Sequence, residues 1–187
     1  MNNKKYILAS KSPRREDLLK LLGIDFTIKA SNICEDLKEH LSNEEIVMDL
    51  AYQKAAHIFK DNQEYIVLGF DTLVILDGVP LGKPKDRENG FDMLRSLSGR
   101  SHTVLTGCAI ISKEHEETFY DSAYVTFNDM TDEEINEYLD TDEPVDKAGA
   151  YGIQGFGAKY ISKVNGDYYS VMGVPLQKLY NKLRDLK

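Results

Sequence analysis

Short apolar runs alternate along this chain with longer stretches in which apolar residues recur at helical spacing. The short runs predict β-strands at residues 6–9, 25–29, 65–70, 73–76, 79–81, 101–112, 117–127 and 159–164. The periodic stretches predict helices at residues 13–22, from 42 or 43 to about 60, at 86–97, at 131–139 and from 175 onward. Helices alternate with strands, but turns at Asp77-Gly78 and at residues 113–116 also indicate hairpins. We therefore expect an α/β fold with a mixed β-sheet flanked by helices.

The composition is typical of a globular protein that is long enough to bury a sizeable core. The chain has 187 residues, of which 42% are hydrophobic and 29% are charged. Its 23 Lys and Arg residues and 31 Asp and Glu residues give a net charge of −8, which argues against broad binding to nucleic acid. No apolar run is long enough for a signal peptide or a membrane span, so we expect a cytoplasmic protein with no membrane partner.

Cysteine and histidine residues give no sign of a metal site. Cys34 and Cys108 have no C-x-x-C spacing, so we expect neither a disulfide framework nor a zinc site. The four histidines also lack the spacing of metal ligands, and we assign them no role.

The segment from Ser10 to Arg15 joins the first predicted strand to the first predicted helix. Ser12 can act as N-cap, and Pro13 fits the first helical position because its missing N–H costs nothing there. Two hydroxyls, one lysine and two arginines surround a helix start whose free N–H groups favour negative charge. This arrangement predicts an anion site, and the alternative is a well-capped surface helix with solvated arginines.

Asp71 stands between two apolar runs of one predicted strand, where an unpaired carboxylate would be costly. The functional interpretation is a metal ligand or a general base at a strand end, a usual place for ligands in open α/β sheets. The alternative is a structural aspartate bonded to nearby backbone N–H groups. Glu35 could supply a second carboxylate, although acidic loop residues are more often solvated.

Two lysines and a glycine-rich loop are further candidates for binding phosphate. Lys54 lies on a predicted helix, where lysines are usually solvated, and Lys83 lies in the Gly82-Lys83-Pro84 turn. Residues 147–157 carry four glycines, which allow the backbone to approach a ligand closely. Neither a P-loop nor a G-x-G-x-x-G motif is present, so those nucleotide-binding classes are not supported.

Six ordered blocks, spread over nearly the whole chain, resemble the Maf family of nucleoside triphosphate pyrophosphatases. The blocks lie at residues 8–15, 69–72, 82–84, 93–100, 146–155 and 166–173. The resemblance implies a single Maf-like domain over residues 1–187, with two lobes around a central cleft. It also implies an elongated mixed sheet similar to that of inosine triphosphate pyrophosphatases, and a homodimer.

The activity that the resemblance implies is hydrolysis of a nucleoside triphosphate between the α- and β-phosphates with a divalent metal cation, Mg²⁺ or Mn²⁺. Asp71 matches the catalytic base of the family. The positions that line the same cleft are Ser10, Arg14, Arg15, Glu35, Lys54 and Lys83. Glu35 and Asp71 are the candidate metal ligands. Arginines, lysines and a metal neutralise phosphate charge while a carboxylate activates water, so this assignment agrees with the chemistry of the residues.

Three positions separate the branches of the family by substrate. Arg14, Thr72 and Gln154 match the branch that resembles dTTP and UTP pyrophosphatases, whereas a 7-methyl-GTP branch has Trp, Gln and Glu there. A glutamine amide can match the O4 and N3–H edge of uracil or thymine. The chain departs from the family at Phe70, where the residue is usually alanine, and at Cys34, where an acidic residue often precedes the glutamate. Phe70 could narrow the cleft or repack the core.

Two other functions stay open from the sequence. One is a noncatalytic nucleotide-binding regulator of septum formation and cell division, because the family has been linked with both. The other is an NTPase or phosphatase that removes the terminal phosphate. Pyrophosphate, orthophosphate or binding without turnover would distinguish these functions.

Overall fold

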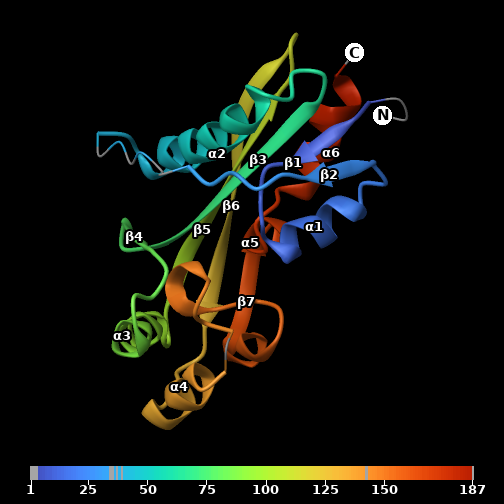
Figure 1. The fold of residues 1–187 in the computed structure, drawn as a ribbon. Coiled ribbons are helices and arrows are strands. Elements are labelled where there is room, and N and C mark those ends of the chain that lie inside the picture. Colours follow the sequence, from blue (N-terminus) through green and yellow to red (C-terminus); the bar gives the residue numbers. More distant parts are fainter. Residues whose placement is uncertain (1–3, 34–35, 37, 39, 142, 187) are drawn as a thin grey trace. The chain divides into compact units, whose positions relative to one another are not determined.

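The computed structural model describes residues 4–33, 36, 38, 40–141 and 143–186 (Figure 1). The strands are β1 (Tyr6–Leu8), β2 (Phe26–Ile28), β3 (Ile66–Leu76), β4 (Val79–Leu81), β5 (Ser101–Ile111), β6 (Glu116–Phe127) and β7 (Ile161–Gly166). The α-helices are α1 (Pro13–Lys20), α2 (Asn43–Phe59), α3 (Arg87–Leu97), α4 (Asp132–Leu139), α5 (Tyr168–Val171) and α6 (Leu176–Asp185). Two 3₁₀ helices, η1 (Ala148–Ala150) and η2 (Phe156–Tyr160), follow α4.

The described strands form a seven-stranded sheet in the order β2-β1-β3-β5-β6-β7, and β4 pairs with β3. Strand β1 is parallel to both β2 and β3, whereas β4 is antiparallel to β3 and β7 is antiparallel to β6. The predicted α/β class with a mixed sheet is therefore confirmed. None of the described helices is both long enough and apolar enough to cross a bilayer.

The chain divides into two compact units. The first unit comprises Met1–Thr72, Thr106–Asp121 and Gly173–Lys187, and the second comprises Leu73–Leu105 and Ser122–Met172. The expected cleft between two lobes stays a prediction.

In the first unit, helices α1 and α2 cover opposite faces of the sheet. The chain passes from β1 through α1 to β2 on one side of β1, and then returns through α2 to β3 on the other side. Right-handed crossovers in opposite directions place their helices on opposite faces. Figure 1 shows α1 and α2 on the two sides of strands β1 and β3. This reversal creates a topological switch point at the carboxyl ends of β1 and β3.

Helix α2 begins at a capping box and lies unusually close to the sheet. Ser42 accepts a hydrogen bond from the backbone N–H of Glu45, whose carboxylate accepts one from the N–H of Ser42. A Cβ at Gly69 of β3 would lie 2.2 Å from the carbonyl oxygen of Ala51, and one at Gly107 of β5 would lie 2.3 Å from that of Val47. Glycine at both positions lets the backbone of α2 approach these strands.

Each unit has its own hydrophobic core. The core beneath α2 contains Ile7, Ala9, Ala51, Ala55, Ile58, Val67, Ala109 and Ile111. The core of the second unit draws on the apolar end of β3 and on α3, α4 and β6. Its largest fully buried members are Leu94, Leu97, Ile135 and Tyr138.

Two predicted boundaries along the strands are wrong. Strand β3 continues through Asp71 and Thr72, where we expected an interruption, because the carboxylate of Asp71 has a cationic partner described below. Strand β7 runs from Ile161 to Gly166 and not over the predicted residues 159–164, because residues 159 and 160 belong to η2 and Gly166 pairs with Ala123 of β6. A Cβ at Gly166 would lie 2.7 Å from the carbonyl oxygen of Ser122, so close approach of two strands explains this glycine.

The short helix α5 was not predicted from the sequence. Asp167 provides its N-cap, because its carboxylate accepts hydrogen bonds from the backbone N–H groups of Tyr169 and Ser170, both at 3.1 Å. Four residues are too few to produce a helical period, so only this cap could have indicated the helix.

Three aromatic rings, those of His102, Phe127 and Tyr151, form a buried cluster in the second unit. Their centroids lie 4.9 to 5.6 Å apart. Nε2 of His102 lies 2.7 Å from the Tyr151 hydroxyl, whereas its Nδ1 has no hydrogen-bond partner within the part of the chain that the structure describes. Burial lowers the pKa of His102 to about 4 and raises the pKa of Tyr151.

The first prediction concerns the close packing of α2. Replacing Gly69 by Ala should lower the free energy of unfolding by about 2 kcal/mol, because the added methyl group can be accommodated only if α2 moves away from β3. Urea denaturation measures this change. Gly82→Ala is the control, since no atom lies within 4 Å of a Cβ at that position. Equal effects of the two substitutions would contradict close packing at Gly69.

The second prediction concerns pH and His102. Unfolded His102 takes up a proton near its ordinary pKa of 6.5, whereas folded His102 does so only near pH 4. Between pH 6.5 and about pH 4 the unfolded state therefore binds more protons than the folded state. The free energy of unfolding consequently falls as the pH decreases through this range. At pH 5 this residue should have lowered the free energy of unfolding by about 2 kcal/mol relative to pH 7.

Urea denaturation at pH 7 and at pH 5 measures this loss. His102→Asn should show a smaller loss of stability between the two pH values than the unsubstituted protein. The same loss in both proteins would mean that other groups cause it.

Candidate active site

The switch point of the first unit carries several of the polar residues that the sequence singled out. Strand β1 pairs with β3 only from Tyr6 to Leu8, and the next backbone hydrogen bond joins the N–H of Ala9 to the carbonyl oxygen of Leu68. Ser10 follows at the carboxyl end of β1, while β3 continues toward Asp71 and Thr72. Open α/β sheets bind ligands at such ends because the loops there leave backbone groups and helix N-termini accessible.

Arg15 connects three segments of the first unit. Its Nη1 donates to Oγ of Ser10 at 3.4 Å, and its Nη2 donates to Oγ1 of Thr72 at 3.1 Å. Its Nε donates to the carbonyl oxygen of Gly173 at 3.1 Å. Oγ1 of Thr72 lies a further 3.0 Å from Oγ1 of Thr106. The guanidinium is thus held in a fixed orientation at the end of β1.

The start of α1 differs in one detail from the prediction. Ser12 occupies the N-cap position and Pro13 begins the helix, but the Ser12 side chain makes no capping hydrogen bond. The backbone N–H of Ser12 instead donates to Oγ of Ser10 at 3.2 Å. The half-buried side chain of Arg14 makes no hydrogen bond or ion pair within the described residues.

Asp71 and Lys54 form an ion pair. The Lys54 ammonium donates to Oδ1 of Asp71, and the two side chains are only 16% and 12% exposed. The bare backbone of Gly69 allows this pair, because it brings α2, which carries Lys54, close to the strand that carries Asp71. The expected cost of an unpaired carboxylate at Asp71 is therefore avoided by a lysine of the same unit.

Alternation along β3 divides the polar residues between two faces of the sheet. Gly69 and Asp71 face α2, whereas Phe70 and Thr72 face the side on which Arg15 lies. Ser10 lies past the end of β1, the strand that pairs with β3. The site of this unit consequently combines an arginine side and a lysine–aspartate side.

Phe70, one of the two departures from the family pattern, is a core residue. Its side chain is 0% exposed, and the Arg15 guanidinium lies 6.0 Å from the centroid of its ring. The ring therefore packs in the interior and supports Arg15. Cys34, the other departure, lies outside the described residues, as does Glu35, whereas Cys108 is buried and has a free thiol.

Lys83 and Gln154 belong to the second unit and are both exposed. Their segments are joined by a hydrogen bond from the backbone N–H of Gly149 to the carbonyl oxygen of Gly82, at 3.0 Å. Gly149 has a φ of 69° and packs against Val74, where a Cβ would lie 2.9 Å from a methyl carbon. The Gly82-Lys83-Pro84 turn is thus hydrogen-bonded to the glycine-rich loop at residues 147–157 within this unit.

Three other glycines of the loop surround two side chains of the protein rather than an open space. A Cβ at Gly152, Gly155 or Gly157 would lie within 3.0 Å of Glu143 or of the Tyr138 hydroxyl. Sequence reasoning missed both side chains, because Tyr138 resembles an ordinary helix residue and Glu143 an ordinary acidic loop residue. The available signal in the sequence was the four glycines of residues 147–157, which follow the acidic residue Glu143.

The described residues contain no group of three or more His, Cys, Asp and Glu side chains that could hold a metal ion. Asp71 is nevertheless a suitable oxygen donor. Mg²⁺ often binds through one or two carboxylates together with substrate phosphates, so a full protein cage is not required.

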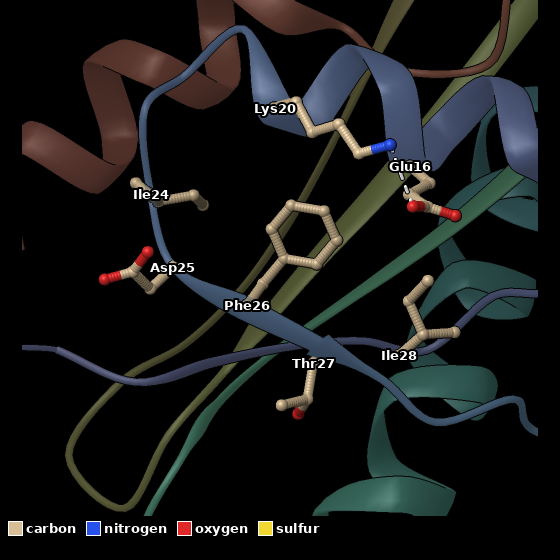
Figure 2. A pocket seen from close by; sticks show the side chains of 7 residues that line it. All are labelled: Glu16, Lys20, Ile24, Asp25, Phe26, Thr27 and Ile28. Carbon is tan, nitrogen blue, oxygen red and sulfur yellow. Dashed lines mark ion pairs between the residues drawn. The ribbon is translucent and has the colours of Figure 1, made fainter.

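A surface hollow of about 460 Å³ lies elsewhere in the first unit, and no predicted site residue lines it. Figure 2 shows its lining, which includes the carboxylates of Glu16 and Asp25 and the ring of Phe26. Lys20, the cation of this hollow, is paired with Glu16 at 2.9 Å. Two carboxylates and one paired lysine do not suit a triphosphate.

The family model described as Maf-like protein matches residues 5–186 of this chain. The chain is 50% identical over 182 residues to a dTTP/UTP pyrophosphatase of Bacillus velezensis, with 97% of this chain and 96% of the relative covered. It is 49% identical over 181 residues to a dTTP/UTP pyrophosphatase of Bacillus cytotoxicus, covering 97% and 95%.

Two solved structures have a similar fold. The HAM1 protein from Coxiella burnetii gives a TM-score of 0.58 at 15% identity, with 98% of this chain and 100% of that chain covered. The Staphylococcus aureus Ham1 protein gives 0.52 at 18% identity, with coverage of 84% and 80%. These likenesses concern the fold alone.

The third prediction concerns the Lys54–Asp71 pair. Lys54→Met should lower the free energy of unfolding by about 3 kcal/mol, because it leaves a buried carboxylate without this cation. Adding Asp71→Asn should recover a large part of the loss, since the double variant no longer buries a charge. Urea denaturation of the two single variants and the double variant measures the coupling. Strictly additive losses would contradict the pair.

Proposed function

The chain belongs to the Maf family, and on that premise we propose that it is a nucleoside triphosphate pyrophosphatase that hydrolyses dTTP and UTP. The products are the nucleoside monophosphate and pyrophosphate. Two relatives with this name match the chain over nearly its full length and theirs, which supports the same activity here. The single observation that carries the chemistry is the Asp71 carboxylate, buried beside Lys54 at the switch point of the sheet.

In the proposed reaction, Asp71 is the general base. Its carboxylate accepts a proton from a water molecule as the water oxygen forms a bond to the α-phosphorus. The bond between the α-phosphorus and the bridging oxygen breaks, and pyrophosphate leaves with that electron pair. Lys54 donates a hydrogen bond to the carboxylate of Asp71 and so keeps it in one orientation.

Phosphate oxygens are proposed to bind at the end of β1. Ser10 and Arg15 lie there, and the positive end of the α1 helix dipole favours an anion. Three hydrogen bonds of Arg15 to protein orient its guanidinium before the substrate arrives, and the positive charge of this group favours a phosphate beside it. Lys83 is the proposed phosphate ligand from the second unit.

A divalent cation, Mg²⁺ or Mn²⁺, is proposed as the cofactor, held by Asp71, Glu35 and the phosphates. When bound, it neutralises phosphate charge and so makes the α-phosphorus more electrophilic. Asp71 fits such a cation as an oxygen donor.

Arg14, Thr72 and Gln154 are the proposed determinants of base choice. The hydroxyl of Thr72 is already bonded to Arg15 and close to Thr106, so we propose that Thr72 acts by orienting Arg15. Gln154 is exposed and offers an amide that can pair with uracil or thymine. A noncatalytic regulator of septum formation is the alternative, but the names of the two relatives and the buried base candidate favour the enzyme.

The fourth prediction is the product of the reaction. Incubation with dTTP or UTP and Mg²⁺ should release pyrophosphate, with lower rates for CTP, dATP and GTP. Asp71→Asn should lower kcat by at least about a hundredfold, because general-base catalysis contributes roughly this much. A coupled pyrophosphate assay measures both. Orthophosphate with a nucleoside diphosphate, or nucleotide binding without turnover, would contradict the proposed function.

A further inference from the structure

Glu143 is held at the centre of a hydrogen-bond cluster in the second unit. Its Oε1 accepts from the Tyr138 hydroxyl at 2.7 Å and from the backbone N–H of Gly157 at 3.1 Å. Its Oε2 accepts from the backbone N–H of Phe156 at 2.7 Å. The Tyr138 hydroxyl in turn accepts from the backbone N–H of Gly152 at 3.0 Å. We call these two side chains the Tyr138–Glu143 clasp.

The clasp binds both ends of the segment 152–157. Hydrogen bonds that a carboxylate accepts are stronger than those between neutral groups, and burial strengthens them further. Tyr138 is 2% exposed, and this burial, together with its hydrogen bond to Glu143, raises its pKa. The hydroxyl therefore keeps its proton at neutral pH and continues to donate to the carboxylate.

The backbone of the segment fits around the clasp only with glycine at three places. A Cβ at Gly155 would lie 2.3 Å from Oε2 of Glu143, and one at Gly152 would lie 2.9 Å from Oε1. A Cβ at Gly157 would lie 2.6 Å from the Tyr138 hydroxyl. Gly155 also has a φ of 93°, a conformation that favours glycine. The clasp therefore explains Gly152 and Gly155, whereas a Cβ at Gly157 would also lie 2.4 Å from the carbonyl oxygen of Gly152.

Gln154 lies in the middle of the segment that the clasp holds. Gln154 is exposed to solvent, and so are its neighbours Gly155 and Phe156. The exposed fraction of Phe156 is 66%. No described side chain other than those of the clasp bonds to the backbone N–H groups of 152, 156 and 157. The position of the Gln154 amide thus depends on Glu143.

We propose that Glu143 is a positioning residue for base selection: it fixes the segment 152–157 so that Gln154 meets the pyrimidine edge of the substrate. This inference rests on the proposed function. Glu143 itself does not touch the base or the phosphates. It acts through the backbone of the segment and through Tyr138.

Glu143→Gln tests the proposal with a nearly unchanged side-chain shape. A carboxamide has one acceptor oxygen, so its NH₂ group would face either the Phe156 N–H or the two donors on Oε1. The ratio of kcat/KM for UTP to kcat/KM for CTP should fall about tenfold, mainly through a higher KM for UTP. Steady-state kinetics with both nucleotides measure the ratio. Glu143→Asp, which keeps both acceptor oxygens, should restore part of it.

Glu134→Gln is the matched control. Glu134 belongs to the capping box of α4 in the same unit and makes no side-chain contact with the segment, so this variant should keep the ratio. In a Gln154→Ala background, Glu143→Gln should leave the remaining ratio unchanged within about twofold. Tyr138→Phe provides a second test if Glu143→Gln does not fold, because it removes one donor to Glu143 and should lower the ratio as well.

An equal loss of activity on UTP and CTP in Glu143→Gln, with the ratio preserved, would overturn the inference and leave Glu143 a structural residue. A further loss of ratio in the Gln154→Ala background would do the same, because Glu143 would then act by another route. Failure of the unsubstituted protein to hydrolyse either nucleotide would instead overturn the proposed function.

Discussion

The close approach of helix α2 to strands β3 and β5 is the constraint on which the first unit depends. It exists because Gly69 and Gly107 present bare backbone to the carbonyl oxygens of Ala51 and Val47. Lys54 lies about one helical turn after Ala51, and Asp71 lies two residues after Gly69. At this separation of helix and strand the lysine reaches the carboxylate, and the two form an ion pair. The strand can then continue through a buried charge without interruption. Packing between glycine and helix backbone thus determines the orientation of the residue that we propose as the catalytic base.

Arg15 plays the corresponding part on the other face of β3. Its guanidinium joins the end of β1, the middle of β3 and the carbonyl oxygen of Gly173, which are far apart in the sequence. Phe70 supports it from the core. Both faces of one strand therefore carry charged groups that are oriented before any substrate binds, and such preorganisation is how enzymes stabilise developing charge on phosphate. In the second unit, the carboxylate of Glu143 holds the glycine-rich loop by accepting hydrogen bonds from the backbone N–H groups of Phe156 and Gly157.

Much of this could be predicted from the sequence, and the exceptions have physical reasons. Apolar periodicity predicted the long helices and strands, because burial of a face leaves a regular pattern. It failed at Asp71, where a partner 17 residues away stabilises a polar strand residue, and at Gly166, where a glycine continues the strand because it packs against β6. Ser10, Arg15 and Thr72 were identified as candidates, but their mutual hydrogen bonds were not, because contacts between distant segments leave no local pattern. The ring of His102 gave no signal for the same reason.

The proposed reaction places bond formation at the α-phosphorus, beside a base held by Lys54. Hydrolysis of UTP in water enriched with the heavy oxygen isotope tests this directly, because the attacking oxygen stays on the phosphorus that it attacks. Mass spectrometry of the products should find one labelled oxygen in UMP and none in pyrophosphate. Label in pyrophosphate, or in orthophosphate released from the terminal position, would contradict the proposed reaction.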